Sequence, residues 1–249
     1  MKNKLAILYY HEVVEAGSGY SYQRIEINKF EEQMKFLSDN GYTSIKFSDL
    51  EQGHLPPKAV IVSFDDGYRS VYDNAAPVMK KYGIKGNVYL ATAYIQPETN
   101  YLDWNMVREL KEQWDFDFQA HTHNHIDIRT ADKSQLKKEV ELSDQLFQKY
   151  LGYLPMAFCM PYGRYDRRAF RELKSLERYK IYLASHTGRI SKNALITGKA
   201  LPRIGISNDD SLKKFKHKIE GKYYLKGRLQ LARLMLNNAI AERIIEKEM

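Results

Sequence analysis

Residues 59–68, AVIVSFDDGY, hold a run of apolar and small residues that ends on two adjacent carboxylates and a glycine. Apolar residues on both faces are typical of a buried strand in a parallel sheet. A buried carboxylate is costly unless it is paired, hydrogen-bonded or bound to a cation. The glycine beside it allows a sharp turn. The stretch therefore predicts either a metal or acid–base site at a strand end, or an Asp-Gly turn that begins a loop.

Strand and helix patterns alternate on both sides of this stretch. Strands are predicted over residues 4–10, 59–64, 86–92, 116–122, 156–159, 180–185 and 201–207. Helical spacing of apolar residues predicts helices over 28–42, 69–83, 102–114, 132–152 and 167–179. Pro77 indicates a kink or a late start of the second helix. Such alternation predicts an α/β fold with a parallel sheet of about seven strands.

Length and composition agree with one soluble α/β domain. The chain has 249 residues, of which 43% are hydrophobic and 28% charged, as expected of a globular protein with a substantial core. Cys159 is the only cysteine, so no intrachain disulfide can form. No segment resembles a signal peptide or a membrane span. These features predict a cytoplasmic protein.

The positive charge is concentrated at the C-terminal end. Net charge is +8, and residues 211–249 hold ten Lys and Arg against four Glu, which leaves +2 for residues 1–210. We therefore expect a folded α/β domain over 1–210 and a basic helical tail over 211–249. The tail fits either a helix packed on the barrel or an interfacial helix attracted to anionic membrane lipid or a lipid-linked substrate. No recognised nucleic-acid-binding module is present, so no specific nucleic-acid contact is predicted.

Polar or turn-forming residues follow five of the predicted strands. They are His11, the pair Asp65 and Asp66, the three histidines of "HTHNH" at 121–125, the turn at 161–163, and His186. Parallel strands end at one rim, where sites of α/β proteins gather. We therefore expect these groups to lie together.

Histidine with carboxylate is a common ligand set for zinc and related divalent ions. In "HTHNH", His121 and His125 can converge across a turn, whereas His121 and His123 would share one strand face. Of two adjacent aspartates, one can bind the ion while the other accepts a proton from water. A backbone N–H of the turn at 161–163 can donate to a developing oxyanion. These groups suit metal-assisted hydrolysis of an amide or ester.

In this order, "SFDDG", "HTHNH" and "MPYG" resemble the first three motifs of the polysaccharide deacetylases, the NodB-homology domain of carbohydrate esterase family 4. The resemblance covers roughly residues 5–207. It implies a distorted (β/α) barrel of about seven strands that hydrolyses the N-acetyl group of an N-acetylhexosamine, as a sugar or oligosaccharide substrate.

The resemblance also implies roles for individual residues. Asp65 matches the catalytic base and Tyr162 the residue whose backbone N–H helps to form the oxyanion hole. Asp66, His121 and His125 match the ligands of one divalent metal ion, for which we expect zinc, with cobalt or nickel as alternatives.

The chain departs from the family pattern in its later motifs. Many members have Arg-Pro-Pro where this chain has Cys159-Met160-Pro161, and the late Asp-x-x-x-Trp and Leu-x-x-His motifs are not evident. Arg203 lies where a late strand should reach the rim and is a candidate supporting residue. "ILYYHEV" near the start resembles the branch that deacetylates poly-N-acetylglucosamine. There His11 would be the general acid, with His186 as the alternative.

Two other functions fit parts of the pattern. A carbohydrate-binding or scaffolding protein that has lost catalysis would explain the missing arginine and terminal histidine. Metal-dependent hydrolysis of phosphate esters would need basic groups at the rim, for which Arg164 and Arg203 are the candidates.

Overall fold

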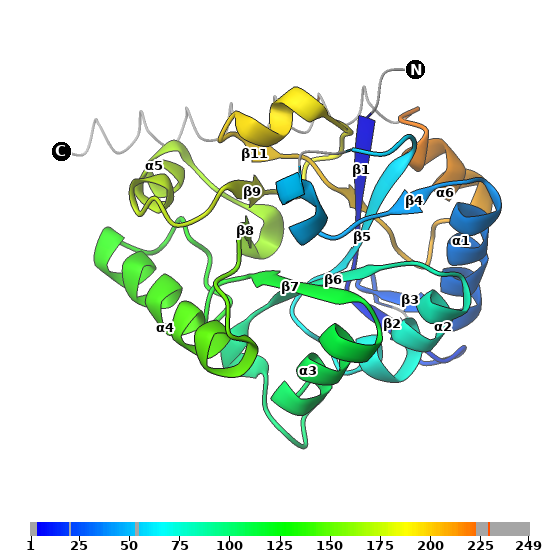
Figure 1. The fold of residues 1–249 in the computed structure, drawn as a ribbon, viewed down its shortest axis with the longest axis horizontal. Coiled ribbons are helices and arrows are strands. Elements are labelled where there is room, and N and C mark those ends of the chain that lie inside the picture. The colour runs from blue at the N-terminus through cyan, green and yellow to red at the C-terminus, as the bar shows by residue number, and fades with distance from the viewer. Residues whose placement is uncertain (1–3, 20, 53–54, 223–228, 230–249) are drawn as a thin grey trace.

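The computed structural model of the chain describes residues 4–19, 21–52, 55–222 and 229 (Figure 1). A ten-stranded sheet in the order β10-β1-β5-β6-β7-β8-β9-β11 forms its centre, with β12 beside β1 and β4 beside β5. Its strands are β1 (Lys4–Tyr10), β4 (Thr43–Ser44), β5 (Ala59–Phe64), β6 (Gly86–Leu90), β7 (Phe116–Ala120), β8 (Ala157–Cys159), β9 (Ile181–Leu183), β10 (Ile190–Ser191), β11 (Ala200–Leu201) and β12 (Ile204–Gly205).

The sheet closes almost completely into a barrel through its last two strands. β11 pairs in parallel with β9, whereas β12 pairs in parallel with β1. Between them stand Pro202, which lacks an N–H, and Arg203, whose N–H donates to the His186 carbonyl at 3.0 Å. The single strand predicted over 201–207 is therefore two short pieces that join the first strand of the barrel to the last. The fold is the distorted (β/α) barrel that the sequence predicts.

The helices lie around the periphery of the barrel (Figure 1). They are α1 (Ile27–Asp39), α2 (Ala76–Lys81), α3 (Trp104–Gln113), α4 (Lys133–Leu151), α5 (Arg167–Ser175) and α6 (Leu212–Ile219), with short helical turns at Ser48–Gln52, Thr92–Tyr94, Pro161–Gly163 and Lys192–Ile196. Aspartates cap three of them: the side chains of Asp103, Asp132 and Asp166 accept N–H groups in the first turns of α3, α4 and α5. Such caps satisfy donors that a helix start leaves free.

Alternating side chains divide the core between the barrel interior and its outer face. In β1, Leu5 and Ile7 belong to a cluster that includes no residue of α1–α6 and therefore fills the interior. Ala6 and Leu8 belong to the cluster packed under α1 and α2. A third cluster lies under α4 and α5. This alternation continues beyond the ends of the strands. It therefore determines which of the residues that directly follow each strand face the mouth of the barrel.

Several local features refine or add to the predicted elements. The helix expected over 69–83 starts as a π-helical turn, Val71–Ala75, and α2 begins at Ala76 with Pro77 in its first turn, where a missing N–H is tolerated. The short parallel pair β2 (Glu12–Val14) and β3 (Arg24–Glu26) has no predicted counterpart. Finally, α6 lies inside the predicted tail.

The first part of the predicted tail is packed on the barrel. Phe215 and Ile219 of α6 are buried in the cluster that also contains residues of α1, and the Phe215 ring is 6.0 Å from that of Phe36. The rest of the tail, residues 223–228 and 230–249, lies outside the described residues. Within the part of the chain that the structure describes, no helix is long and apolar enough to cross a membrane.

Candidate active site

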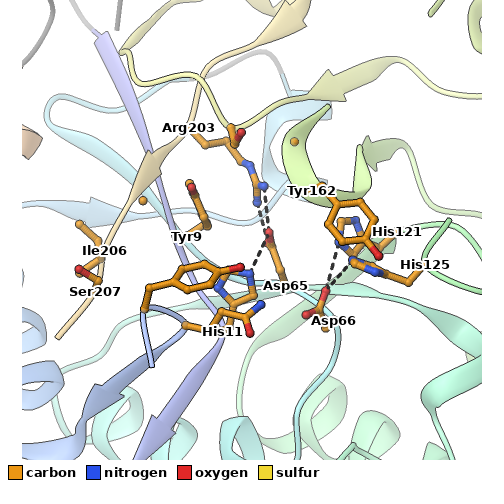
Figure 2. Close-up of a pocket in the computed structure, with 15 residues that line it drawn as sticks. Tyr9, His11, Asp65, Asp66, His121, His125, Tyr162, Arg203, Ile206 and Ser207 are labelled. Carbon is orange, nitrogen blue, oxygen red and sulfur yellow. Dashed lines mark hydrogen bonds and ion pairs between the residues drawn. The ribbon is translucent and has the colours of Figure 1, made fainter. Parts of the chain in front are cut away.

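A cavity of about 350 Å³ opens at the carboxyl ends of the barrel strands (Figure 2). Asp65 and Asp66 directly follow β5, His121 follows β7 and His11 follows β1. Every second residue of a strand faces the barrel interior. This alternation continues from Ile61 of β5 to Asp65, and from Ile7 of β1 to His11. The cavity is lined by Tyr9, His11, Tyr22, Gln23, Asp65, Asp66, His121, His125, Tyr162, Gly163, Ser185, Arg203, Gly205, Ile206 and Ser207.

The two adjacent aspartates point to different partners. Asp65 faces Arg203, whereas Asp66 faces His121 and His125 (Figure 2). Asp66 has φ 71° and Gly67 has φ 86°, so the backbone turns sharply directly after the strand. The Asp-Gly pair therefore forms the expected turn at the start of the loop, and this turn separates the two carboxylates.

Asp66, His121 and His125 form a group that could hold a metal ion. Oδ1 of Asp66 lies 3.3 Å from Nε2 of His121 and 3.2 Å from Nε2 of His125. Two ligand atoms on a tetrahedral zinc ion, each about 2.0–2.1 Å from it, would be about 3.3 Å apart. Both distances from Asp66 thus match the spacing of two ligand atoms on one ion. Of the two geometries open for "HTHNH", the structure adopts the one that joins His121 to His125.

The hydrogen bonds around this group favour a cation. Nδ1 of His121 donates to the Cys159 carbonyl at 2.8 Å, so in the neutral ring Nε2 carries a lone pair. Asp66 Oδ1 is buried and has no hydrogen-bond partner among the described residues. A carboxylate facing ring nitrogens without a hydrogen bond fits a divalent ion.

Arg203 binds Asp65 with both ends of its guanidinium. Nη1 donates to Oδ1 at 2.6 Å and Nη2 to Oδ2 at 2.9 Å, and the arginine is 1% exposed. Burial would raise the pKa of Asp65, but Arg203 outweighs it, so the pKa is lowered and the side chain is a carboxylate. The guanidinium lies 4.3 Å from the Tyr9 ring centre and 5.3 Å from that of Tyr89. Arg203, which lies between β11 and β12, therefore stands beside Asp65, whereas the third motif of this chain offers no arginine.

The two histidines considered as general acid lie in different places. His11 lines the cavity, and its Nε2 is 4.0 Å from Asp65 Oδ2. Burial lowers the pKa of His11, against the opposing effect of the Asp65 and Asp66 carboxylates. His186 lines a separate cavity beside Arg189 and Lys199, and burial lowers its pKa to about 4. The structure brings His11 to the site and leaves His186 outside it.

Tyr162 and His123 complete the predicted set. Tyr162 has φ 59° in the turn after β8, and its ring lies 4.6 Å from that of His125. Gly163 and Arg164 donate their N–H groups to the Met160 and Pro161 carbonyls. Across the residues described here, the Tyr162 N–H has no acceptor. His123 points elsewhere: its Nδ1 is 2.9 Å from Thr92 Oγ1.

The sequence patterns did not predict that Tyr22 and Gln23 line the cavity. Both precede β3, a strand of three residues. Three residues are too few for an alternating pattern to predict a strand, so no signal placed this segment near the site.

Comparison with known proteins identifies relatives over most of the chain. Residues 52–181 match the family described as Polysaccharide deacetylase. The Bacillus subtilis (strain 168) protein YxkH, named for the polysaccharide deacetylases, is 30% identical over 197 residues, covering 76% of this chain and 67% of the relative. The poly-beta-1,6-N-acetyl-D-glucosamine N-deacetylase of Staphylococcus epidermidis is 27% identical over 188 residues, covering 70% and 62%. That of Escherichia coli (strain K12) is 22% identical, and this chain spans 38% of its length.

Solved structures show the same fold. The Streptococcus pyogenes deacetylase PplD, solved in complex with acetate, matches with a TM-score of 0.78 and 26% identity, covering 88% of this chain and 99% of that one. IcaB from Ammonifex degensii matches with a TM-score of 0.70 and 20% identity, covering 88% and 98%. The family match, the barrel fold and the grouping of Asp66, His121 and His125 all point to the same family. This chain belongs to the polysaccharide deacetylase family.

Proposed function

We propose that this chain is a divalent-metal-dependent hydrolase that removes the N-acetyl group from an N-acetylhexosamine in a glycan or glycan precursor. The observation that carries the proposal is the convergence of Asp66, His121 and His125 beside an ionised, arginine-bound Asp65. Names of the relatives point to β-1,6-linked N-acetylglucosamine as the first polymer to test.

Asp66, His121 and His125 would hold the ion, for which zinc suits the two histidines and one carboxylate, with cobalt and nickel as alternatives. When bound, a divalent ion there would polarise the acetyl carbonyl and lower the pKa of a water molecule. Asp65 would take the proton from the attacking water, because Arg203 keeps its carboxylate ionised and fixed in direction. The Tyr162 N–H would donate to the developing oxyanion.

Protonation of the departing amine is assigned to His11. Burial lowers the pKa of His11, which makes its protonated form a stronger acid toward the departing amine. Asp65 Oδ2, 4.0 Å from His11 Nε2, can pass on the proton that it takes from water. The proton would thus move from water to Asp65, then to His11, and finally to the amine nitrogen.

Two observations argue against the two other functions. An inactive carbohydrate-binding protein was favoured by a missing arginine and a missing histidine, yet Arg203 and His11 stand at the site. Phosphate-ester hydrolysis would require free basic groups, but Arg203 is bound to Asp65 and Arg164 is not among the cavity-lining residues.

Acetate release from N-acetylglucosamine oligomers by the purified chain tests the proposal. We expect turnover that a chelator abolishes and that added zinc, cobalt or nickel restores. Asp65→Asn should lower turnover by about 10²–10⁴-fold, the range for a positioned base, while the bound metal is retained. A protein that binds none of these ions and releases no acetate would contradict the proposal.

A cytoplasmic location and a contact between the tail and anionic lipid are further proposals. The first is supported by the single cysteine, which is buried and free, and the second by the excess of Lys and Arg in residues 211–249. Cell fractionation tests the location. Sedimentation with anionic and neutral vesicles, compared between the full chain and one shortened after residue 222, tests the contact.

A further inference from the structure

Glu139 of α4 is a buried acid whose carboxylate, among the described residues, accepts hydrogen bonds from the loop between His121 and His125. It is 8% exposed. Its Oε2 accepts the N–H of His123 at 2.9 Å and the N–H of Asn124 at 2.8 Å. Its Oε1 accepts from the side-chain amide of Asn124 at 2.7 Å. The carboxylate therefore binds the two residues that directly precede His125.

This loop has a backbone that needs support from outside. Thr122 has φ 64° and His125 has φ 54°. Both lie in the left-handed region of backbone conformation, which is unfavourable for most residues other than glycine. Such conformations persist when surrounding contacts fix them. The His123 carbonyl accepts the N–H of Ala93 at 2.9 Å on one side. Glu139 supplies three hydrogen bonds from the helix on the other side.

We propose that Glu139 is a positioning residue that holds this loop so that His125 points at Asp66, and thereby sets the affinity and geometry of metal binding. The inference rests on the proposed function, since it assumes that Asp66, His121 and His125 bind a divalent ion. The bonds of Glu139 go to residues 123 and 124 and not to the three ligating side chains, so it acts through the backbone. Partners that orient metal ligands from behind typically change metal affinity about 10–100-fold when removed.

Three substitutions separate geometry from charge. Glu139→Leu keeps a buried, helix-forming side chain but removes both acceptors. Glu139→Asp keeps the charge and shortens the side chain by one methylene, which withdraws the carboxylate from the loop. Glu139→Gln keeps the length and one acceptor oxygen for the two backbone N–H groups. Glu141, which pairs with Lys137 on the exposed face of the same helix, provides the matched control as Glu141→Asp.

Binding of Co²⁺ and of Zn²⁺ to the full chain is the readout, followed by the visible absorption of the cobalt form and by competition with a chelator. We expect Glu139→Leu and Glu139→Asp to bind both ions about 10–100-fold more weakly and to change the cobalt spectrum. Glu139→Gln should lose less affinity than either, and Glu141→Asp should match the parent chain. Thermal unfolding without metal, measured on each variant, reports any loss of fold separately.

Parent-like affinity and spectrum in folded Glu139→Leu and Glu139→Asp would overturn the inference. If Glu139→Leu does not fold, Glu139→Asp decides by itself. A loss in Glu139→Gln as large as in Glu139→Leu would assign the effect to charge and would also overturn it. A parent chain that binds neither ion would refute the proposed function instead, so the two failures are distinguishable.

Discussion

Arg203 is the residue on which the charge state of Asp65 depends. Both carboxylate oxygens of Asp65 accept from its guanidinium, and both side chains are almost fully buried. A buried ion pair is weak evidence for stability as a whole, but removal of one partner leaves the other charge uncompensated. We therefore expect that substitution of Arg203 alone destabilises the protein more than substitution of both partners together.

We expect Arg203→Met to lower the free energy of unfolding by about 3–5 kcal/mol, because Asp65 would be left buried without a partner. The double variant Asp65→Asn/Arg203→Met should recover part of that loss, since the uncompensated charge is gone. Urea unfolding of the parent and of these two variants measures both quantities. Equal stability of Arg203→Met and the parent chain would show that the pair is not held as the structure has it.

His11 offers a test of proton delivery at the same scale. We expect His11→Ala to reduce turnover by about 10²–10⁴-fold with metal content unchanged, because a positioned acid is lost while the ligands remain. His186→Ala is the matched control, since His186 lines a different cavity, and its turnover should stay near that of the parent. Acetate release and metal analysis on both variants decide the assignment. Near-normal turnover in His11→Ala would refute it.

At the scale of elements, Asp210 joins α6 to the strand that closes the barrel. Asp210 is 1% exposed, and its carboxylate lies 2.7 Å from Lys214 Nζ and 2.5 Å from Lys218 Nζ. Lys218 also donates to the Gly205 carbonyl of β12 at 2.7 Å. One buried acid thus connects the helix at the start of the basic C-terminal region to the last strand.

This connection should make stability depend on pH in a defined direction. Burial would raise the pKa of Asp210, but Lys214 and Lys218 outweigh it, so its folded-state pKa is lowered. A lowered pKa contributes stability that is present above the unfolded value, about 3.9, and is lost as pH falls through the folded value. The stability advantage of the parent over Asp210→Asn should be full near about pH 6 and shrink below about pH 4.

Melting temperatures of the parent chain and of Asp210→Asn across this range measure the difference. An Asp210→Asn offset that stays constant down to about pH 3 would contradict a carboxylate stabilised by the two lysines.

At the scale of the whole molecule, the metal group joins segments that are distant in sequence. Asp66 follows β5, whereas His121 and His125 follow β7, two strands further around the barrel. A ligand that binds only the folded state stabilises it by mass action, by about 2.7 kcal/mol at a free concentration 100 times its Kd. For a chain of this length that corresponds to a rise of roughly 5–10 °C in melting temperature.

We therefore expect added zinc or cobalt to raise the melting temperature of the parent chain by roughly this amount and a chelator to reverse the rise. His125→Ala should respond much less, because one of its three ligands is gone. Differential scanning calorimetry with and without metal tests this. An equal rise in the parent and in His125→Ala would place the stabilising ion elsewhere.

Much of the fold follows from local patterns in the chain. The buried run at 59–64 and the alternation of strands with helices predict a parallel sheet, and the family resemblance implies that it closes into a barrel. Asp166 caps the helix that is predicted to begin at residue 167. Asp65, Asp66, His121 and His125 follow predicted strands, and because parallel strands end at one rim, their proximity is predictable as well.

Other features were decided by tertiary contacts. The pairing of Arg203 with Asp65 joins residues 138 positions apart, and it arises only because β11 and β12 close the barrel and carry Arg203 to β5. The choice between His11 and His186 was open in sequence because both follow strands, and only the three-dimensional path of each loop separates them. Glu139 reads in sequence as one more charged residue of a helix, and its burial against the histidine loop depends on how α4 packs. Local periodicity determines elements and the rim they share, whereas side-chain partners across the barrel depend on closure and packing, which no local pattern encodes.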